Sequence, residues 1–175
     1  WEYWHENGQK KEERNYIKGR ERGEGGSYIT RYENGQKMME FTKDGKKTWW
    51  YENGQIELVQ TYKDGKLDGN LTWWDKSGQK RGEQNYKDDE LDGMQISWNK
   101  SGQVSSEENY KDGKLIGETI YQYFMNGQKV SEKNYIDDVF DGMNSFWYEN
   151  GQKSTEVNYI NGKREGVRTE WYENG

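Results

Sequence analysis

Glutamate is the residue type in this chain whose spacing could support acid/base chemistry. General acid/base catalysis by carboxyl groups needs two of them in different environments, within roughly 5 to 10 Å of each other. Glutamates on adjacent repeats of a sheet would lie about 10 Å apart, which permits such a pair. An active site needs its pair once, whereas this glutamate recurs, so we expect structural hydrogen bonds to an indole N–H or a neighbouring strand. The recurring residues are Glu13, Glu40, Glu83, Glu107, Glu132 and Glu156.

Metal and cofactor chemistry has few candidate residues. His5 is the only histidine, and its position holds Tyr or Phe in several other copies of the repeat, so we expect it to pack as an aromatic. With no cysteine and no second histidine, a transition-metal site is not expected. The EF-hand spacing, the calcium-roll repeat and the phosphate-binding glycine loop are absent from the sequence. The sequence therefore predicts no catalytic residue, no cofactor, no metal and no enzyme activity.

Composition narrows the class of partner. The chain is 29% hydrophobic and 33% charged, yet 15% aromatic, with a formal net charge of −6. This combination indicates a thin fold in which aromatic side chains cover their neighbours. The sequence contains no basic block, so nucleic-acid binding is not expected. No apolar run approaches the roughly 20 residues of a membrane-spanning helix, so membrane insertion is not expected. The compartment is not indicated, and because the chain begins inside a repeat we expect it to be a piece of a longer one.

The elements that position these residues come from one short phrase, Trp-Tyr-Glu-Asn-Gly-Gln-Lys, which is clearest at residues 147–153. Its glycines are separated by 27, 19, 24, 24, 25, 24 and 24 residues. A fixed period of this size is typical of a repeat array. We expect one continuous array of about seven repeats over residues 1–175, irregular at 19–51. The glycines are Gly8, Gly35, Gly54, Gly78, Gly102, Gly127, Gly151 and Gly175.

Two kinds of turn alternate along the array. One is the Asn-Gly-Gln phrase, and the other is Tyr-Lys-Asp-Gly-Lys, as at residues 62–66. Asn-Gly and Asp-Gly between short aromatic runs favour two-residue type I′ hairpin turns. The segments between turns are rich in Trp, Tyr, Thr and Ile and are predicted to be strands. The predicted fold is all-β without a helix: an elongated, single-layer antiparallel β-meander of about fourteen strands, built from stacked hairpins of about 24 residues.

A two-residue Asn-Gly loop also predicts the register. The Trp four residues before each turn glycine would oppose the residue three after it, and would share a face with the glutamates. A Tyr eight residues after the glycine would lie on the opposite face, across from a strand glycine such as Gly69. These positions form the expected structural ladder. Its members are Trp50, Trp74, Trp98, Trp147, Trp171, Tyr62, Tyr86, Tyr110, Tyr135 and Tyr159.

The phrase Trp-Tyr-Glu-Asn-Gly-Gln-Lys, followed by Glu, Asn-Tyr and Lys-Asp-Gly-Lys-Leu-Asp-Gly, resembles the bacterial variant of the MORN repeat. Proteins of this kind are often grouped with the YwqK-like antitoxin family. The resemblance covers essentially the whole chain and is weakest at residues 19–51. It implies stacked β-hairpins and a protein-binding or scaffolding role, in some members as an antitoxin or immunity partner. It implies no catalytic residue.

The aromatic residues that vary from copy to copy are the candidates for partner binding. A face that only stacks would repeat itself, whereas a face that meets a partner can vary, and exposed Trp and Tyr are favoured in binding hot spots. The hypothesis is that another protein binds Trp49, Tyr51, Trp73, Phe146 and Tyr148. One alternative is a glycan or cell-wall binding module. Another is a structural spacer or filament component whose terminal strands associate edge to edge.

Overall fold

The computed structural model describes residues 1–15 and 26–174, which form eighteen β-strands and no helix. They belong to two compact units, Trp1–Asp92 and Gly93–Gly175. The first unit contains β1 (Glu2–Trp4), β2 (Lys10–Asn15), β3 (Ser27–Arg31), β4 (Lys37–Phe41), β5 (Lys46–Trp50), β6 (Ile56–Lys63), β7 (Lys66–Leu67), β8 (Gly69–Trp74), β9 (Lys80–Lys87) and β10 (Glu90–Leu91). The second contains β11 (Gly93–Trp98), β12 (Val104–Lys111), β13 (Lys114–Tyr123), β14 (Lys129–Ile136), β15 (Val139–Phe140), β16 (Gly142–Trp147), β17 (Lys153–Ile160) and β18 (Lys163–Glu170).

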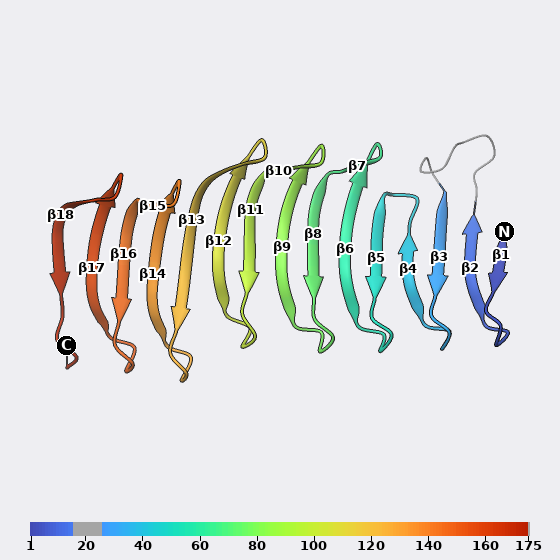
Figure 1. Cartoon of the computed structure of the whole chain (residues 1–175), viewed down its shortest axis with the longest axis horizontal. Helices are drawn as coiled ribbons and strands as arrows, with labels where there is room; N and C mark the ends of the chain where they lie inside the picture. Colours follow the sequence, from blue (N-terminus) through green and yellow to red (C-terminus); the bar gives the residue numbers. More distant parts are fainter. Residues whose placement is uncertain (16–25, 175) are drawn as a thin grey trace. The chain divides into compact units, whose positions relative to one another are not determined.

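Within each unit, successive long strands pair antiparallel and run in alternating directions (Figure 1). Three of the eighteen strands, β7, β10 and β15, have two residues each and directly precede a longer strand. The predicted all-β antiparallel meander is therefore confirmed. Without the three two-residue strands, the number of strands is close to the expected value of about fourteen. No described segment is a helix that could cross a membrane.

The Asp-Gly turn at Asp64-Gly65 adopts the predicted conformation. Asp64 and Gly65 have φ of 50° and 83°, and Lys63 pairs with Lys66 across them. Both central residues of a type I′ turn need positive φ. Asp88 and Asp89 also meet this requirement, with φ of 51° and 73°. Aspartate therefore serves at both central positions, although glycine is the less strained choice at the second.

The Asn-Gly-Gln turns differ from the prediction. In the turn after β5, the Tyr51 N–H donates to Gln55 O at 2.8 Å and the Gly54 N–H donates to Tyr51 O at 2.9 Å. Only Gly54 has positive φ, at 85°. This is a three-residue loop, a type I turn followed by a left-handed glycine. Asn53 stays out of the left-handed region because its Oδ1 accepts the Gln55 N–H at 3.1 Å.

A β-bulge follows each of these turns and corrects the register. Trp50 opposes Ile56 rather than the predicted Glu57, but Trp49 opposes Leu58, as a two-residue loop would place it. The three-residue loop shifts the pairing by one, and the bulge at Glu57 shifts it back. The residue skipped by the ladder lies three after the turn glycine in every such hairpin. These residues are Lys11, Met38, Glu57, Arg81, Ser105, Val130 and Ser154.

The sheet has little interior. Among the described residues Val157, at 5% exposure, is the one buried hydrophobic side chain, and Ser131 and Asn144 are the most deeply buried side chains. Neighbouring strands and side chains across each face must therefore supply most of the stability, as in other repeat proteins.

Residues 16–25 lie outside the described residues, and they include residues 19–25 of the segment expected to be irregular. The rest of it forms β3, β4 and β5 with antiparallel pairing, and Tyr28 packs on Phe41 with ring centroids 5.7 Å apart. The β4–β5 turn has the three-residue form, because the Thr42 N–H donates to Lys46 O and Gly45 has a φ of 85°.

Candidate binding surface

The Asn-Gly-Gln turn links each repeat to the next. The Tyr51 hydroxyl donates to Trp74 O at 2.9 Å, and Asn53 Nδ2 donates to Lys76 O at 2.8 Å. Sequence reasoning missed these bonds, although the repeated Tyr and Asn are their signal. The same tyrosine bond joins Tyr32 to Trp50 and Tyr148 to Trp171. The same asparagine bond extends from Asn7, Asn34, Asn126 and Asn150.

His5 occupies the tyrosine position of the first turn. Its Nε2 lies 3.0 Å from Arg31 O, so the ring donates to the backbone of the next repeat as the tyrosines do. A catalytic or metal-binding role would need further polar partners. The described residues contain no group of three or more His, Asp or Glu that could hold a metal ion.

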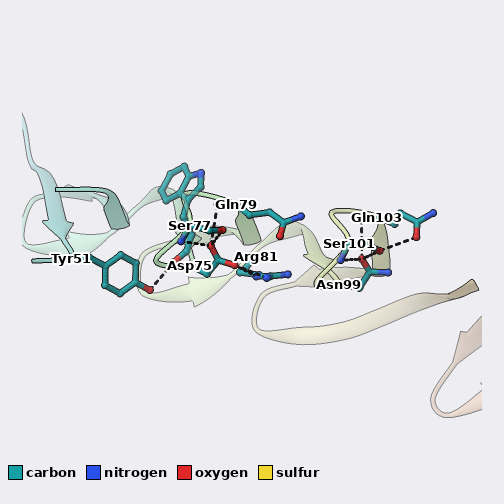
Figure 2. Close-up of polar contacts among 9 residues, drawn as sticks. Tyr51, Asp75, Ser77, Gln79, Arg81, Asn99, Ser101 and Gln103 are labelled. Carbon is teal, nitrogen blue, oxygen red and sulfur yellow. Dashed lines mark hydrogen bonds and ion pairs between the residues drawn. The ribbon is translucent and has the colours of Figure 1, made fainter. Parts of the chain in front are cut away.

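Two turns replace the Tyr and Asn pair by side chains that bond within their own turn (Figure 2). Asp75 Oδ1 accepts the N–H groups of Ser77 and Gln79 at 2.9 and 3.1 Å. Asn99 Oδ1 accepts those of Ser101 and Gln103 at 2.9 and 3.0 Å. The sequence contains this signal, because Ser replaces Asn only where Asp or Asn replaces Tyr two residues earlier.

Asp75 also has a strong electrostatic partner. The Ser77 hydroxyl and the Arg81 guanidinium, whose Nε lies 2.9 Å from Oδ2, lower the pKa of Asp75 to about 2. Arg81 is the bulged residue of this hairpin, so the bulge aims it back at the turn. The negative charge of Asp75 is therefore balanced by Arg81 of the same chain.

Lysine is the main partner of the glutamate ladder. Lys153 donates to Glu156 at 2.9 Å, and its Nζ lies 5.8 Å from the Trp147 ring centroid and 5.7 Å from that of Trp171. The two residues are three apart, and the bulge at Ser154 brings them to one face. Ammonium groups therefore bind these carboxylates. The other pairs are Lys10–Glu13, Lys37–Glu40, Lys80–Glu83 and Lys129–Glu132.

The expected bond from a neighbouring strand occurs at two of the glutamates. Asn70 Nδ2 donates to Glu83 at 3.2 Å, and the Tyr121 hydroxyl donates to Glu107 at 3.1 Å. Burial and the Glu107 carboxylate together raise the pKa of Tyr121 to about 12. The ladder has the arrangement of a repeated structural device, with each carboxylate bound to a nearby donor.

The face opposite this ladder contains a hollow in the first unit. Trp49 pairs with Leu58 across β5 and β6, and Leu58 pairs with Trp73 across β6 and β8, so the three side chains form one row. The hollow above this row has a volume of ≈ 520 Å³. We call it the Trp49–Trp73 hollow. It is lined by Trp49, Tyr51, Glu57, Leu58, Gln60, Trp73 and Trp74.

Trp73 leans away from the centre of the hollow because the next strand has no side chain at the facing position. Gly82 pairs with Trp73, and a Cβ at Gly82 would lie 1.8 Å from Trp73 Cζ2. The indole therefore rests on the Gly82 backbone. The predicted pairing of Gly69 with a tyrosine is confirmed, because Gly69 pairs with Tyr86. The side chain nearest to a Cβ added at Gly69 is that of Thr61, at 3.4 Å.

The structure brings together three of the five predicted partner-binding residues, Trp49, Tyr51 and Trp73, around the hollow. The other two belong to the second unit. There Phe146 lies between Ser131 and Thr155 with Lys133 Nζ 5.9 Å from its ring centroid, and Tyr148 bonds to Trp171 O.

The predicted structural ladder residues lie in strands or directly beside turns. On the tyrosine face, Tyr135 stacks on Phe140 at 4.8 Å and Phe140 packs on Tyr159 at 5.0 Å between centroids. Sequence reasoning missed the contribution of Glu57, Leu58 and Gln60 to the hollow, because these positions differ in type from repeat to repeat.

Comparison with known proteins agrees with this construction. A sequence profile described as the MORN repeat variant matches residues 1–18, 43–64, 67–88, 91–112 and 140–161, together more than half of the chain. The chain belongs to the MORN repeat variant family. None of the curated proteins matches it.

Solved structures also include similar chains. One of them, the crystal structure of the GtfA/B complex bound to UDP and GlcNAc, is 17% identical, with a TM-score of 0.25. The match covers 67% of this MORN repeat chain and 23% of that chain. This chain thus spans about a quarter of that relative's length, and a likeness this low carries no argument about function.

Proposed function

We propose that this MORN repeat protein is a non-enzymatic binding module that docks another protein on the face containing the Trp49–Trp73 hollow. The observation that supports the proposal is the hollow itself, ≈ 520 Å³ and lined by Trp49, Tyr51 and Trp73 among polar groups. A concave, largely aromatic site with a few polar groups is typical of ligand sites, and Trp and Tyr dominate binding hot spots. The specific form to test first is an antitoxin or immunity partner.

Site-specific photo-crosslinking tests the docking face. A benzoylphenylalanine at Leu58 lies in the hollow, whereas one at Val59 lies on the other face, because successive strand residues point to opposite sides. We expect a discrete crosslinked protein from position 58 in an extract of the source cells, and its loss in the Trp49→Ala/Trp73→Ala variant. Identical crosslinks from both positions, or none from position 58, would contradict the proposal.

The stability of single variants provides a second check. If Trp73 and Phe146 serve a partner, their replacement by alanine should destabilise the protein less than replacement of Trp74. The measurement is the urea midpoint of unfolding for each variant. Equal losses would place Trp73 and Phe146 with the structural ladder, and the proposed surface would have to be withdrawn.

A glycan is the second candidate ligand of the same surface. It is favoured by the presence of the Gln60 amide and the Glu57 carboxylate beside two indole rings, since sugar hydroxyls need such polar groups and sugar C–H faces can stack on rings. A glycan array with the wild-type protein and with Trp73→Ala separates the two candidates. Glycan binding that Trp73→Ala abolishes, with no protein crosslink, would favour the glycan.

A further inference from the structure

The floor and walls of the Trp49–Trp73 hollow leave room for a flat group. Leu58 forms the floor, and the strands bearing Trp49 and Trp73 flank it on either side. Two strand spacings of about 4.8 Å separate the backbones of the flanking strands. Trp73 leans over Gly82, away from Leu58. A planar group about 3.5 Å thick can therefore lie above Leu58 against an indole ring.

Glu57 contributes to the hollow a carboxylate that has no ion-pair partner among the described residues. In the part of the chain that the structure describes, no lysine or arginine forms an ion pair with Glu57, although the ladder glutamates are bound by lysines. Glu57 is the one acidic residue among the bulged positions, and its neighbour Arg81 at the next bulge is paired with Asp75. Burial raises the pKa of Tyr51, and the charges of Glu57 and Asp75 raise it further, which agrees with negative potential at the hollow.

Rings of the hollow already accept cations. Lys47 Nζ lies 4.6 Å from the Trp49 ring centroid, and Lys76 Nζ lies 5.9 Å from that of Tyr51. Among the described residues no lysine or arginine lies over the ring of Trp73, which leaves this indole, the preferred ring type for a cation, available. The same two lysines would repel an incoming cation, so they oppose part of the attraction from Glu57.

We propose that the Trp49–Trp73 hollow binds the guanidinium group of an arginine side chain presented by the protein partner, an inference that rests on the proposed protein-binding function. Arginine fits better than lysine because its flat guanidinium stacks on aromatic rings and bonds a carboxylate through two parallel N–H groups. Trp73 provides the stacking surface, Glu57 the carboxylate and Leu58 the apolar floor for the methylene stem.

The test uses the whole 175-residue chain and the peptide acetyl-Gly-Gly-Arg-Gly-Gly-amide. A second peptide carries citrulline, which has nearly the shape of arginine without the charge. Binding is followed by NMR through the indole N–H signals of Trp49 and Trp73. We expect the arginine peptide to shift both signals and to bind about three- to tenfold more tightly than the citrulline peptide, from one cation–π contact and one ion pair.

Three variants test the role of each charge. Glu57→Gln removes the ion pair but keeps the cation–π contact with Trp73, so it should lower the affinity for the arginine peptide at least about twofold, toward that for the citrulline peptide. Glu52→Gln, which removes an exposed carboxylate of the same turn outside the hollow, should leave it within about twofold. Lys76→Met removes a repelling cation and should tighten arginine binding without changing citrulline binding.

Equal affinity for the two peptides would overturn the arginine assignment, and so would an effect of Glu52→Gln as large as that of Glu57→Gln. Shifts of the same indole signals by a cellodextrin, without shifts by the arginine peptide, would assign the hollow to a sugar instead. A protein crosslink at position 58 together with equal peptide affinities would leave the proposed function standing while this inference fails. Arginine binding in the NMR test without any crosslink would mean that the hollow binds arginine while the proposed protein-binding function fails.

Discussion

Gly82→Ala should destabilise the protein through a single steric contact. Its Cβ would lie 1.8 Å from Cζ2 and 2.0 Å from Cη2 of Trp73, well inside the roughly 3.5 Å at which carbon atoms meet. The indole must therefore swing toward Leu58. Overpacking of this kind costs about 1–3 kcal/mol, and alanine recovers about 0.4–1 kcal/mol by restricting the unfolded chain. We expect a net loss of about 1–2 kcal/mol in the free energy of unfolding.

Urea unfolding followed by tryptophan fluorescence measures this loss. Gly117→Ala is the matched control, because Gly117 is also a strand glycine but its nearest atom would be Tyr135 O, at 3.8 Å from the added Cβ. The control should be unchanged or more stable by up to about 1 kcal/mol. The folded Gly82→Ala protein should also show altered near-ultraviolet circular dichroism as Trp73 moves. If both variants unfold at the wild-type midpoint with unchanged spectra, Trp73 does not rest on Gly82.

The remaining predictions concern two tyrosine hydroxyls. Tyr51→Phe removes the donor to Trp74 O and should lower the free energy of unfolding by about 0.5–1.5 kcal/mol, whereas Tyr172→Phe, with a side chain 83% exposed, should change it by less than about 0.5 kcal/mol in urea unfolding. Equal effects would contradict the inter-repeat bond. The pKa of Tyr121 is raised from 10.0 to about 12, so the unfolded chain loses this proton first and stability falls as the pH rises through that window. Tyr121→Phe should remove up to about 2–3 kcal/mol of this fall; a pH dependence identical to that of the wild type between pH 9 and pH 12 would refute the assignment.

The two turn types show what local sequence can and cannot predict. Asp64-Gly65 follows the rule for a type I′ turn, with positive φ at both residues. Asn53-Gly54 contains an equally strong type I′ signal, but the Asn53 side chain bonds to the Gln55 N–H and to the next repeat. The Gln55 N–H that Asn53 binds lies outside the dipeptide. A prediction from the dipeptide alone cannot include it, whereas the alternation of strands and turns depends only on local pattern and was predictable.

The candidate surface, like the turns, was predictable only in part from the sequence. Alternation along a strand places Trp49 and Trp73 on one face, and both line the hollow in the structure. Trp74, expected on the other face, also lines the hollow from the end of its strand. The bulge was not predicted, and it alone decides that the Glu57 side chain lines the hollow. Tyr51 both lines the hollow and donates a hydrogen bond to the next repeat. The residue type at this turn position, which varies between copies, therefore reflects both roles.

The bonds between Asn-Gly-Gln turns have a direction. The hydroxyl or amide donor always belongs to the earlier turn and the carbonyl acceptor to the later one, as from Asn126 to Glu149 and from Tyr148 to Trp171. For these turn-to-turn bonds, loss of a later repeat frees side-chain donors that can turn to water, whereas loss of an earlier repeat frees fixed carbonyl groups. Unravelling that starts at one end of such an array differs chemically from unravelling that starts at the other. A repeat of matching turn sequence can also be duplicated in place, because it brings both the acceptor for the preceding turn and the donors for the following one.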